Sequence, residues 1–440
     1  MENQEYSVGL DIGTTKIVAI VGRRNAHGKI EITINSIKAA VAEAQSSAGV
    51  PIHKVTVGIA GKHIRSLQHS DYIMRENPDR FITDDDIEAL KDQVKKLVML
   101  PGEEIIHVLP QEYKVDSEGE IQEPVGMHGK RLEANFHVVV GQMGSIRNIA
   151  RCVREAGLEM EALTLEPLAS SEAVLTKEEK EAGVAIVDIG GGTTDIAIFK
   201  DNIIRHTCVI PYGGGIITED IKEGCSIIEK HAEQLKVKFG SAVPELEKDS
   251  TFVTIPGLHG RPDKEISLKT LAQIINARVE EILEMVNTEL KAYGAFEQKK
   301  KLIAGIVLTG GGSNLKHLRQ LANYTTGFDS RIGFANEYIA NDKNQYLKGP
   351  EFATSIGLLM ESLKIRDKKT VAVEEEIEIE ADTKVEQKEA QTNANAESQT
   401  QTTPQIEEEF KTPVQTSRPS KPTFGQSLME KVKKFFEEVE

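Results

Sequence analysis

Several classes of protein are excluded by what this sequence lacks. Its three cysteines, Cys152, Cys208 and Cys225, show no CxxC spacing, so neither a disulfide framework nor a cysteine zinc site is expected. No stretch approaches the roughly 18 uninterrupted apolar residues of a membrane-spanning helix. The N-terminus lacks the basic and apolar segments of a secretion signal. Acidic residues outnumber basic ones by 69 to 53, a formal net charge of −16, which disfavours nucleic-acid binding. We therefore expect a protein of the reducing cytoplasm.

Common catalytic motifs are missing as well. The sequence contains no GxxxxGK[ST] loop and no GxGxxG turn, which removes the basis for a P-loop or Rossmann site. It has no HExxH motif and no Gly-x-Ser-x-Gly elbow between a strand and a helix. The eleven histidines show no metal-ligand spacing, and His107, His128 and His137 are interpreted as structural or surface residues.

The composition divides the chain into three regions. At roughly 150 residues per domain, 440 residues correspond to about three domains' worth of chain. Residues 1–365 have the apolar runs and periodic segments of a globular region. Residues 366–423 are acidic and almost free of large apolar side chains, so we expect a disordered linker. A solvated helix around residues 371–389 is the alternative for part of it.

The last segment, residues 424–440, has the pattern of an amphipathic helix. At about 100° per residue its apolar side chains fall within one arc of roughly 140°. Lys431 and Lys433 lie at the edges of this arc, as suits a helix at a bilayer surface. We expect it to bind membrane lipids, with a protein-docking helix as the alternative. The predicted membrane-binding residues are Phe424, Leu428, Met429, Val432, Phe435, Phe436 and Val439.

One local pattern occurs twice in the globular region. Residues 7–23 read as strand, glycine turn and strand, and residues 183–210 repeat this and add another strand. Asp11-Ile12-Gly13 aligns with Asp188-Ile189-Gly190, and each is followed by two threonines. The repetition predicts an internally duplicated α/β fold. Helical periodicity is found outside the two copies, at residues 83–97, 146–156 and 268–290.

The two turns have the chemistry of a phosphate site. Glycine and threonine let backbone N–H groups and hydroxyls approach a phosphate closely, and Lys16 adds a positive charge. Asp11 and Asp188 would hold Mg²⁺, largely through water. Two ordinary glycine hairpins are the alternative interpretation. The candidate phosphate-binding residues are Gly13, Thr14, Thr15, Lys16, Gly190, Gly191, Gly192, Thr193 and Thr194.

A third glycine cluster follows an apolar run at residues 306–309. Its members are Gly310, Gly311, Gly312 and Ser313, and a helix is predicted just after them at residues 315–321. Glycines at the end of a strand let a flat ring or a ribose-phosphate approach the backbone, and a helix N-terminus favours an α-phosphate. Downstream of two phosphate turns, this cluster is the expected adenosine site.

These motifs resemble those of the actin, sugar-kinase and seventy-kilodalton heat-shock ATPase superfamily. The resemblance rests on DIGTTK (11–16), DIGGGTTD (188–195) and LTGGGS (308–313). It implies connecting helices at residues 166–170 and 352–358, with Glu166 near the attacking water and Asp188 as the second catalytic candidate. It also implies that a loop and a helix contact the γ-phosphate and ribose through Gly213, Gly214, Gly215, Glu233 and Lys236.

A narrower resemblance is to the FtsA family of actin-like bacterial division proteins. It rests on residues 106–110, 123–129 and 132–139, which resemble the subdomain that this family inserts into the first half of the fold. The implied fold is a duplicated actin-like (RNase H-like) ATPase fold with an inserted subdomain. The predicted boundaries are 1–80 for the first half of domain 1, 81–160 for the insert, 161–185 for the return to domain 1, 186–365 for domain 2, 366–423 for the linker and 424–440 for the terminal helix.

The family resemblance also implies a function. It implies that the protein binds ATP and Mg²⁺ with at most slow hydrolysis, polymerises with itself and holds the tubulin-like protein FtsZ. The expected location is the cytoplasmic face of the inner membrane at the division septum, together with other division proteins and without nucleic acid. The FtsZ C-terminal peptide would bind around residues 271–290, with Arg278 as a partner for acidic groups; a solvated helix face is the alternative.

Three other functions fit the same superfamily. A small-molecule kinase would need a substrate pocket with a general-base aspartate and has no use for a tethered amphipathic helix. A chaperone ATPase needs a β-rich peptide-binding domain, which residues 366–423 cannot form. A pilus-assembly adaptor like PilM shares the cleft and the insert, but the long linker and terminal helix are not expected there.

Overall fold

The computed structural model describes residues 7–12, 17–24, 30–35, 51–257, 262–335, 347 and 349–367. All of these belong to one compact unit, Met1–Ala372. The predicted terminal helix, and all but the first two residues of the predicted linker, lie outside the described residues. Among the helices of the described part, none combines the length and the apolar character needed to cross a membrane.

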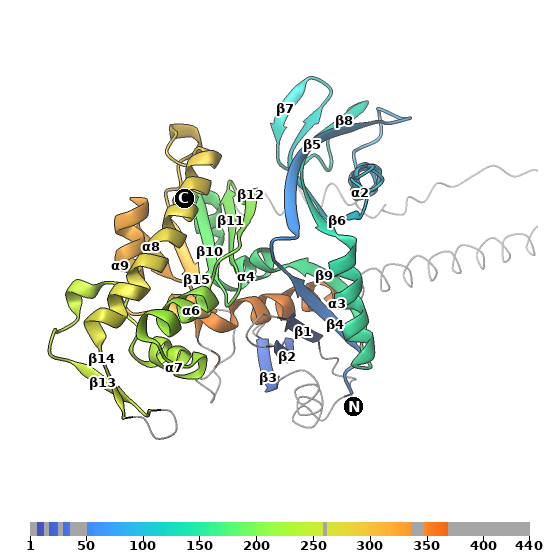
Figure 1. Cartoon of the computed structure of the whole chain (residues 1–440). Helices are drawn as coiled ribbons and strands as arrows, with labels where there is room; N and C mark the ends of the chain where they lie inside the picture. Colours follow the sequence, from blue (N-terminus) through green and yellow to red (C-terminus); the bar gives the residue numbers. More distant parts are fainter. Residues whose placement is uncertain are drawn as a thin grey trace, which may run out of the picture. The chain divides into compact units, whose positions relative to one another are not determined.

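The first half of the fold is built on a five-stranded sheet with the order β3-β2-β1-β4-β9 (Figure 1). Strands β3, β2 and β1 are antiparallel neighbours, whereas β4 and β9 continue the sheet in parallel. The strands are β1 (Ser7–Ile12), β2 (Ile17–Arg24), β3 (Ile30–Asn35), β4 (Lys54–Ile59) and β9 (Glu159–Leu165). β1 is buried over most of its length and mostly apolar, as expected of a strand covered on both faces.

The second half repeats this topology with the order β12-β11-β10-β15-β16. Again three antiparallel strands are followed by two parallel ones. The strands are β10 (Val184–Ile189), β11 (Thr194–Lys200), β12 (Ile203–Ile210), β15 (Ile306–Thr309) and β16 (Ser330–Ile332). The identical order and direction confirm the duplication predicted from the two glycine turns.

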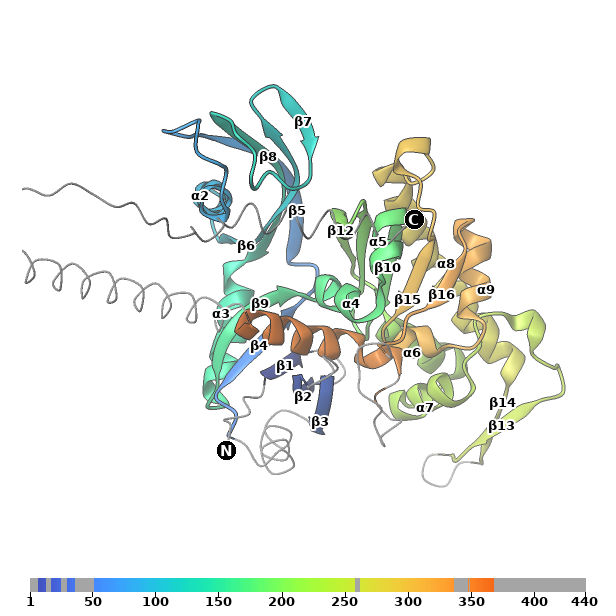
Figure 2. The same cartoon turned by 180° about the vertical axis from the view of Figure 1, so that it is seen from behind.

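Two helices pack between the sheets. They are α4 (Glu166–Val174), which follows β9, and a helix over residues 353–367, drawn in orange in Figure 2. Both share one hydrophobic core with Ile20 of β2 and Ile186 of β10. The helices approach so closely that a Cβ at Gly357 would overlap the Ala169 carbonyl. These helices correspond to the connecting helices expected at residues 166–170 and 352–358.

A separate four-stranded antiparallel sheet, with the order β5-β8-β6-β7, is inserted between β4 and β9 (Figure 1). Its strands are β5 (Ile64–Met74), β6 (Glu103–Val115), β7 (Glu118–Ile121) and β8 (Arg131–Gln142). Helix α2 (Asp84–Lys95) covers one face through Ile87, Leu90 and Val94. Thr83 and Asp86 form a capping box that fixes the start of this helix.

The insert begins and ends earlier than the predicted segment 81–160. β5 lies before residue 81 but pairs with β8 along its whole length. Conversely, β9 lies partly within the predicted segment but pairs with β4 in the first sheet. Helix α3 (Met143–Glu155) packs against that sheet through Val153. The strand pairings define the boundary of the insert, because β5 pairs within the inserted sheet and β9 pairs within the first sheet.

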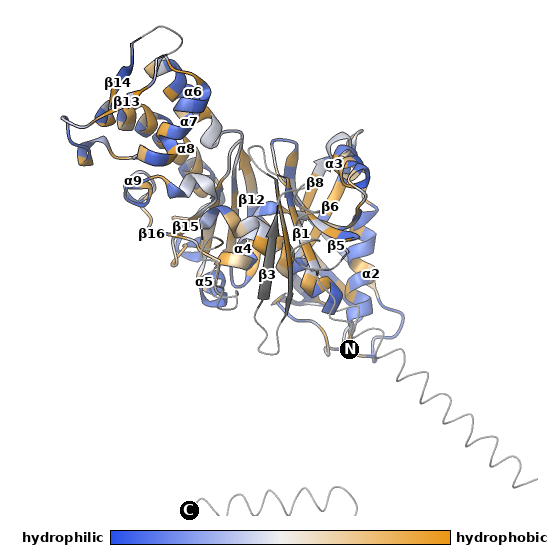
Figure 3. Ribbon diagram, turned by 90° about the horizontal axis from the view of Figure 1, so that it is seen from below, coloured by the Kyte–Doolittle hydropathy of each residue, from blue (hydrophilic) through white to orange (hydrophobic). Residues whose placement is uncertain are grey.

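The second half carries additional helices around its own core. These are α6 (Gly214–Cys225), α7 (Glu229–Phe239), α8 (Leu268–Tyr293) and α9 (Leu318–Thr326), whereas α5 (Lys177–Ala182), just before β10, has no buried residue. Helices α6, α7 and α8 show both hydrophobic and hydrophilic positions (Figure 3), and the apolar side is packed inward. A hairpin of β13 (Phe252–Ile255) and β14 (Lys264–Ser267) adjoins them. Short 3₁₀ helices lie at Pro244–Leu246, Gln298–Lys300, Gly311–Asn314 and Pro350–Phe352.

Candidate functional site

The second glycine turn connects β10 to β11 in a tight hairpin. Asp188, the last residue but one of β10, lies opposite Asp195, and the Gly190 N–H donates a hydrogen bond to the Thr193 carbonyl at 2.9 Å. The start of α6 packs against this turn, since the N–H of its first residue, Gly214, donates to the Gly190 carbonyl at 2.8 Å. A Cβ at Gly213 would lie 2.6 Å from the same carbonyl. Glycine is therefore required here for the close approach of two backbone segments.

Asp188 is oriented by hydroxyl groups from both connecting helices. Ser170 of α4 donates to Asp188 Oδ2 at 2.7 Å, and Thr354 donates to the same oxygen at 3.0 Å. In the first sheet, Ser355 donates to Asp11 Oδ2 at 3.0 Å. Hydrogen bonds of this kind fix the orientation of a carboxyl group. Side chains of the connecting helices therefore help to position both aspartates.

Four carboxyl groups gather where the two halves meet: Asp11, Glu166, Asp188 and Asp195. Burial, followed by the negative charges of Asp11, Asp195 and Asp188, raises the pKa of Glu166 well above its usual value. Burial also raises the pKa of Asp195 to about 7, although its hydrogen bond from Thr193 acts in the opposite direction. Such mutual raising of pKa values is the expected behaviour of carboxyl groups in a site suited to a cation.

A pocket of about 260 Å³ lies beside this carboxyl cluster in the second half. It is lined by glycines from three segments and by side chains of α6, α7 and the loop before helix 353–367. The lining residues are Gly190, Gly191, Gly214, Ile217, Glu233, Lys236, Val237, Gly311, Gly312, Asn314, Leu315 and Glu351. The structure therefore brings together four segments that are distant along the sequence: the predicted second phosphate turn, γ-phosphate loop, ribose helix and adenosine cluster.

The charged side of the pocket is formed by Lys236 and Glu233, one turn apart on α7. The Lys236 ammonium donates to the Gly214 carbonyl and to the Thr218 hydroxyl, both at 2.7 Å. It also forms an ion pair with Glu233 at 2.7 Å. Lys236 is mostly buried, and its ammonium group is held against Gly214 in the wall of the pocket. An ammonium held beside a glycine loop can attract phosphate or a ribose hydroxyl.

The adenosine cluster differs in detail from its prediction. Gly310 adopts a φ of 81°, and a Cβ there would overlap Asp188 Oδ1. Gly311 begins a short 3₁₀ helix, and α9 starts only at Leu318. The helix expected at residues 315–321 is thus displaced, because His317 takes a left-handed conformation immediately before it. A Cβ at Gly311 would meet only Glu351 Cβ, at 3.9 Å, so the space over this glycine is open to the pocket.

Several predicted residues lie near the pocket without lining it. The Thr194 hydroxyl donates to the Tyr212 carbonyl, and the Ser313 hydroxyl to the Gly310 carbonyl, so both are used to hold loops together. Gly215 donates its N–H to the Gly191 carbonyl at 2.7 Å. Gly192 and Thr193 complete the hairpin turn between β10 and β11. The first phosphate turn, Gly13, Thr14, Thr15 and Lys16, lies outside the described residues.

Sequence reasoning missed the residues that support these groups. Ser170, Thr354 and Ser355 lie in the connecting helices that the resemblance implied, but no role was predicted for their hydroxyls, because a hydroxyl within a helix reads as an ordinary polar position. Asn314 directly follows the third glycine cluster, but no role was predicted for its side chain, which is hydrogen-bonded to Glu351 at 2.9 Å. Asp195 did have a signal, since an antiparallel hairpin sets it directly opposite Asp188.

Arg278 of α8, the predicted partner for an acidic peptide, is already paired within the domain. Its guanidinium donates to both carboxylate oxygens of Asp220, at 2.6 and 3.0 Å, and to Glu281 at 2.5 Å. The hydrogen bond to Asp220 is the main cause that raises the pKa of Arg278. An acidic peptide would therefore have to compete with two internal carboxylates.

Comparison with a solved structure identifies the class of fold. The "PilM-PilN type IV pilus biogenesis complex" aligns with a TM-score of 0.57 and 16% identity, over 82% of this chain and 99% of that one, a similarity of fold alone. A family model described as "SHS2 domain inserted in FTSA" matches residues 61–140, which contain the four-stranded sheet except for the last two residues of β8. Duplicated sheets, two shared helices and this insert define an actin-like fold, as the sequence predicted.

Sequence comparison then identifies the family. The model "Cell division protein FtsA" matches residues 185–357. The cell division protein FtsA of Pseudomonas aeruginosa is 38% identical over 386 residues, which cover 83% of this chain and 91% of that protein. The one from Escherichia coli (strain K12) is 33% identical over 382 residues, covering 81% and 90%. The chain belongs to the FtsA family of cell division proteins.

Proposed function

We propose that the protein binds ATP with Mg²⁺ in the pocket beside Asp188. The observation that carries the proposal is the lining itself, in which glycines from three separate segments face Lys236 and Glu233. Gly190 and Gly191 would approach the phosphates, Gly311 and Gly312 the adenosine, and Glu233 and Lys236 the ribose. Asp11 and Asp188 would hold Mg²⁺ largely through water, which neutralises phosphate charge. Gly13, Thr14, Thr15 and Lys16 would complete the phosphate site.

We further infer that hydrolysis is slow. Glu166 is the candidate for orienting the attacking water, with Asp188 beside it. Burial and the negative charges of three neighbouring aspartates raise the pKa of Glu166. The ionised fraction of this carboxyl group, which alone can accept a proton from water, is therefore smaller than for an ordinary glutamate. The nucleotide would then act mainly by holding the two halves in one arrangement.

At the level of the cell, we infer that the protein polymerises through an actin-like fold and holds FtsZ at the cytoplasmic face of the membrane. Membership of the FtsA family supports the role in division. The apolar arc of residues 424–440 supports reversible binding to lipid. Filament formation would strengthen this binding, since many helices would be linked together.

Nucleotide binding can be tested with one glycine. Replacement of Gly311 by leucine should fill the adenosine side of the pocket, because the side chain would project into the space that is open there. The affinity for a fluorescent ATP analogue in the presence of Mg²⁺ should fall at least about tenfold. Gly144→Leu is the matched control, as a Cβ at this position on α3 meets nothing within 4 Å. Equal affinity of both variants would refute the pocket assignment.

The membrane role needs a separate experiment. The full chain and a chain truncated before Phe424 are each sedimented with liposomes, with and without Mg-ATP and FtsZ. We expect only the full chain to sediment and to carry FtsZ with it. If both chains sediment equally little, residues 424–440 dock onto a protein instead.

The FtsZ-binding surface around residues 271–290 can be tested through Arg278. Arg278→Ala should weaken binding of an FtsZ C-terminal peptide if the guanidinium leaves Asp220 for the peptide. Glu284→Gln, at an exposed position on the same helix, is the control that keeps Arg278 in place. An unchanged affinity for the Arg278→Ala chain would leave this residue as a purely internal ion-pair partner.

A further inference from the structure

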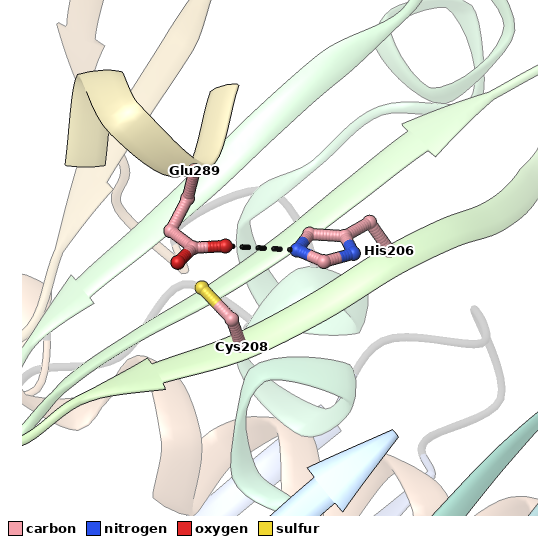
Figure 4. A group of neighbouring side chains, drawn as sticks. All are labelled: His206, Cys208 and Glu289. Carbon is pink, nitrogen blue, oxygen red and sulfur yellow. Dashed lines mark hydrogen bonds and ion pairs between the residues drawn. The ribbon is translucent and has the colours of Figure 1, made fainter. Parts of the chain in front are cut away.

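A group of metal-ligand side chains lies away from the nucleotide pocket. His206 and Cys208 of β12 and Glu289 of α8 point toward one another (Figure 4). Their three donor atoms all lie within 4.8 Å of one another, and each residue is partly buried. His206 Nε2 and Glu289 Oε2 are 3.2 Å apart. Within the residues that the structure describes, this is the group of histidine, cysteine and carboxylate side chains with suitable spacing for a metal ion.

The alternation of β12 explains why the two strand residues meet the helix. Arg205 and Thr207 face the inserted sheet, where they contact Glu112 of β6 at 2.7 Å and His137 of β8 at 2.8 Å. Successive side chains of a strand point to opposite faces, so His206 and Cys208 share the other face. Glu289 reaches that face from α8, which packs against β12. One face of β12 therefore contacts the inserted sheet, and the other face holds His206 and Cys208.

The chemistry of the three groups suits a particular class of cation. Imidazole, thiolate and carboxylate are the donors that Zn²⁺ combines in proteins, whereas Mg²⁺ and Ca²⁺ prefer oxygen alone. Tetrahedral bonds to zinc of about 2.0–2.3 Å separate neighbouring donors by roughly 3.4–3.8 Å. Small side-chain adjustments from the observed separation would meet this requirement. A fourth ligand can come from solvent, because His206 also lines an open cleft of about 880 Å³.

An ordinary polar cluster is the competing interpretation. In that case His206 and Glu289 form a hydrogen bond or ion pair, and Cys208 is a buried thiol beside them. Burial and the neighbouring Glu289 carboxylate raise the pKa of Cys208, so the thiol keeps its proton unless a cation displaces it. The two interpretations differ in one measurable property, which is the affinity for a thiophilic cation.

We propose that His206, Cys208 and Glu289 form a binding site for one divalent cation of the zinc type, which joins β12 to α8. The spacing of cysteines and histidines along the sequence predicted no metal site, because the donors come from two elements that only the fold brings together. The bound ion would tie α8 to the strand that holds the inserted sheet. The site is independent of the proposed nucleotide pocket and shares no residue with it.

The test uses the full chain, freed of metal and kept reduced. Zn²⁺ is titrated against a chromogenic chelator, and one equivalent should bind. Cys208→Ser, His206→Gln and Glu289→Gln should each weaken binding by more than about 100-fold, because loss of even an indirect partner costs about 10–100-fold. Cys152→Ser is the matched control, since Cys152 is exposed and belongs to α3, outside the cluster. Its affinity should equal that of the original chain.

Cobalt provides a second readout that does not depend on how well the variants fold. Co²⁺ bound to the original chain should give a near-ultraviolet thiolate-to-metal band, and excess Zn²⁺ should abolish it. Absence of that band would overturn the proposal, and so would Zn²⁺ binding no stronger than in a chain that carries Cys208→Ser, His206→Gln and Glu289→Gln together. Equal Zn²⁺ affinity of the Cys208→Ser and original chains would do so as well.

Discussion

In the first five-stranded sheet, Gly9 stands two residues before Asp11, and in the second, Ile186 stands two residues before Asp188. A Cβ at Gly9 would lie 2.5 Å from the Leu359 backbone nitrogen and 2.9 Å from the Ser355 carbonyl oxygen. Ile186, by contrast, is fully buried in the core that it shares with Leu359. The helix over residues 353–367 therefore rests directly on the backbone of β1 but is separated from β10 by a side chain.

This unequal packing explains how one helix serves both halves. Ser355 lies close enough to β1 to donate to Asp11, while the adjacent Thr354 donates to Asp188. If both sheets carried a large residue at the equivalent position, the helix would be held away from Asp11 as well. The comparison indicates that duplicated motifs can diverge in packing while both aspartates keep a hydroxyl partner.

The largest expected effect comes from adding a side chain at Gly9, where β1 contacts the helix most closely. Gly9→Ala places a methyl group against the backbone of the helix, which cannot move without disturbing the core around Leu359. We expect the free energy of unfolding to fall by about 3 kcal/mol, the upper end for overpacking. Urea denaturation followed by circular dichroism measures it. Gly144→Ala is the control, with no loss expected, and a similar stability of both variants would contradict the close contact.

The second prediction concerns the insert, which only the first half carries. The Leu165 N–H at the end of β9 donates to His107 Nε2 of β6 at 3.0 Å, and burial lowers the pKa of His107 to about 4. As the pH falls, the unfolded chain therefore binds a proton at His107 before the folded chain does. The stability associated with neutral His107 is present above about pH 6.5 and is lost toward pH 4.

Between about pH 7 and pH 4.5 the loss at His107 should be on the order of 2–3 kcal/mol. His107→Gln keeps an acceptor for the Leu165 N–H but cannot be protonated in this range. The difference in unfolding free energy between the two chains, measured at both pH values, isolates this group from the acidic residues. An equal pH dependence of both chains would show that His107 does not titrate in this way.

The sequence predicted the duplication and most of the pocket because those features depend on local patterns. A turn such as Gly190-Gly191-Gly192 between two apolar runs is visible without knowledge of the fold. The insert boundary was not predictable in the same way, since β5 reads as an alternating strand that either sheet could accept. Likewise, the hydroxyl partners of Asp11 and Asp188 come from residues 170, 354 and 355, and only the crossing of two helices brings them near.

The third prediction compares the aspartates themselves. Asp188→Ala should weaken Mg²⁺-dependent binding of an ATP analogue at least about tenfold, equivalent to about 1.4 kcal/mol. Asp188 lies against Gly310 next to the pocket and has two hydroxyl partners from the connecting helices. Asp11→Ala should have the smaller effect of the two, because Asp188 lies directly against Gly310 of the predicted adenosine cluster. A larger loss with Asp11→Ala would mean that the first half dominates binding.

The smallest effect is expected at the residue that replaces Gly9 in the second half. Ile186→Val removes one methyl group from a fully buried side chain, and such a change costs about 1 kcal/mol. Because Ile186 acts as a spacer, the shortened chain should leave the helix in place and Mg-ATP affinity unchanged. Urea denaturation and the fluorescent ATP analogue measure the two quantities on the same sample. If Ile186→Val weakened nucleotide binding as much as Asp188→Ala, the distance between the helix over residues 353–367 and β10 would itself determine how Asp188 is positioned. Close packing of this helix would then matter equally in both halves, despite the different residues at the contact.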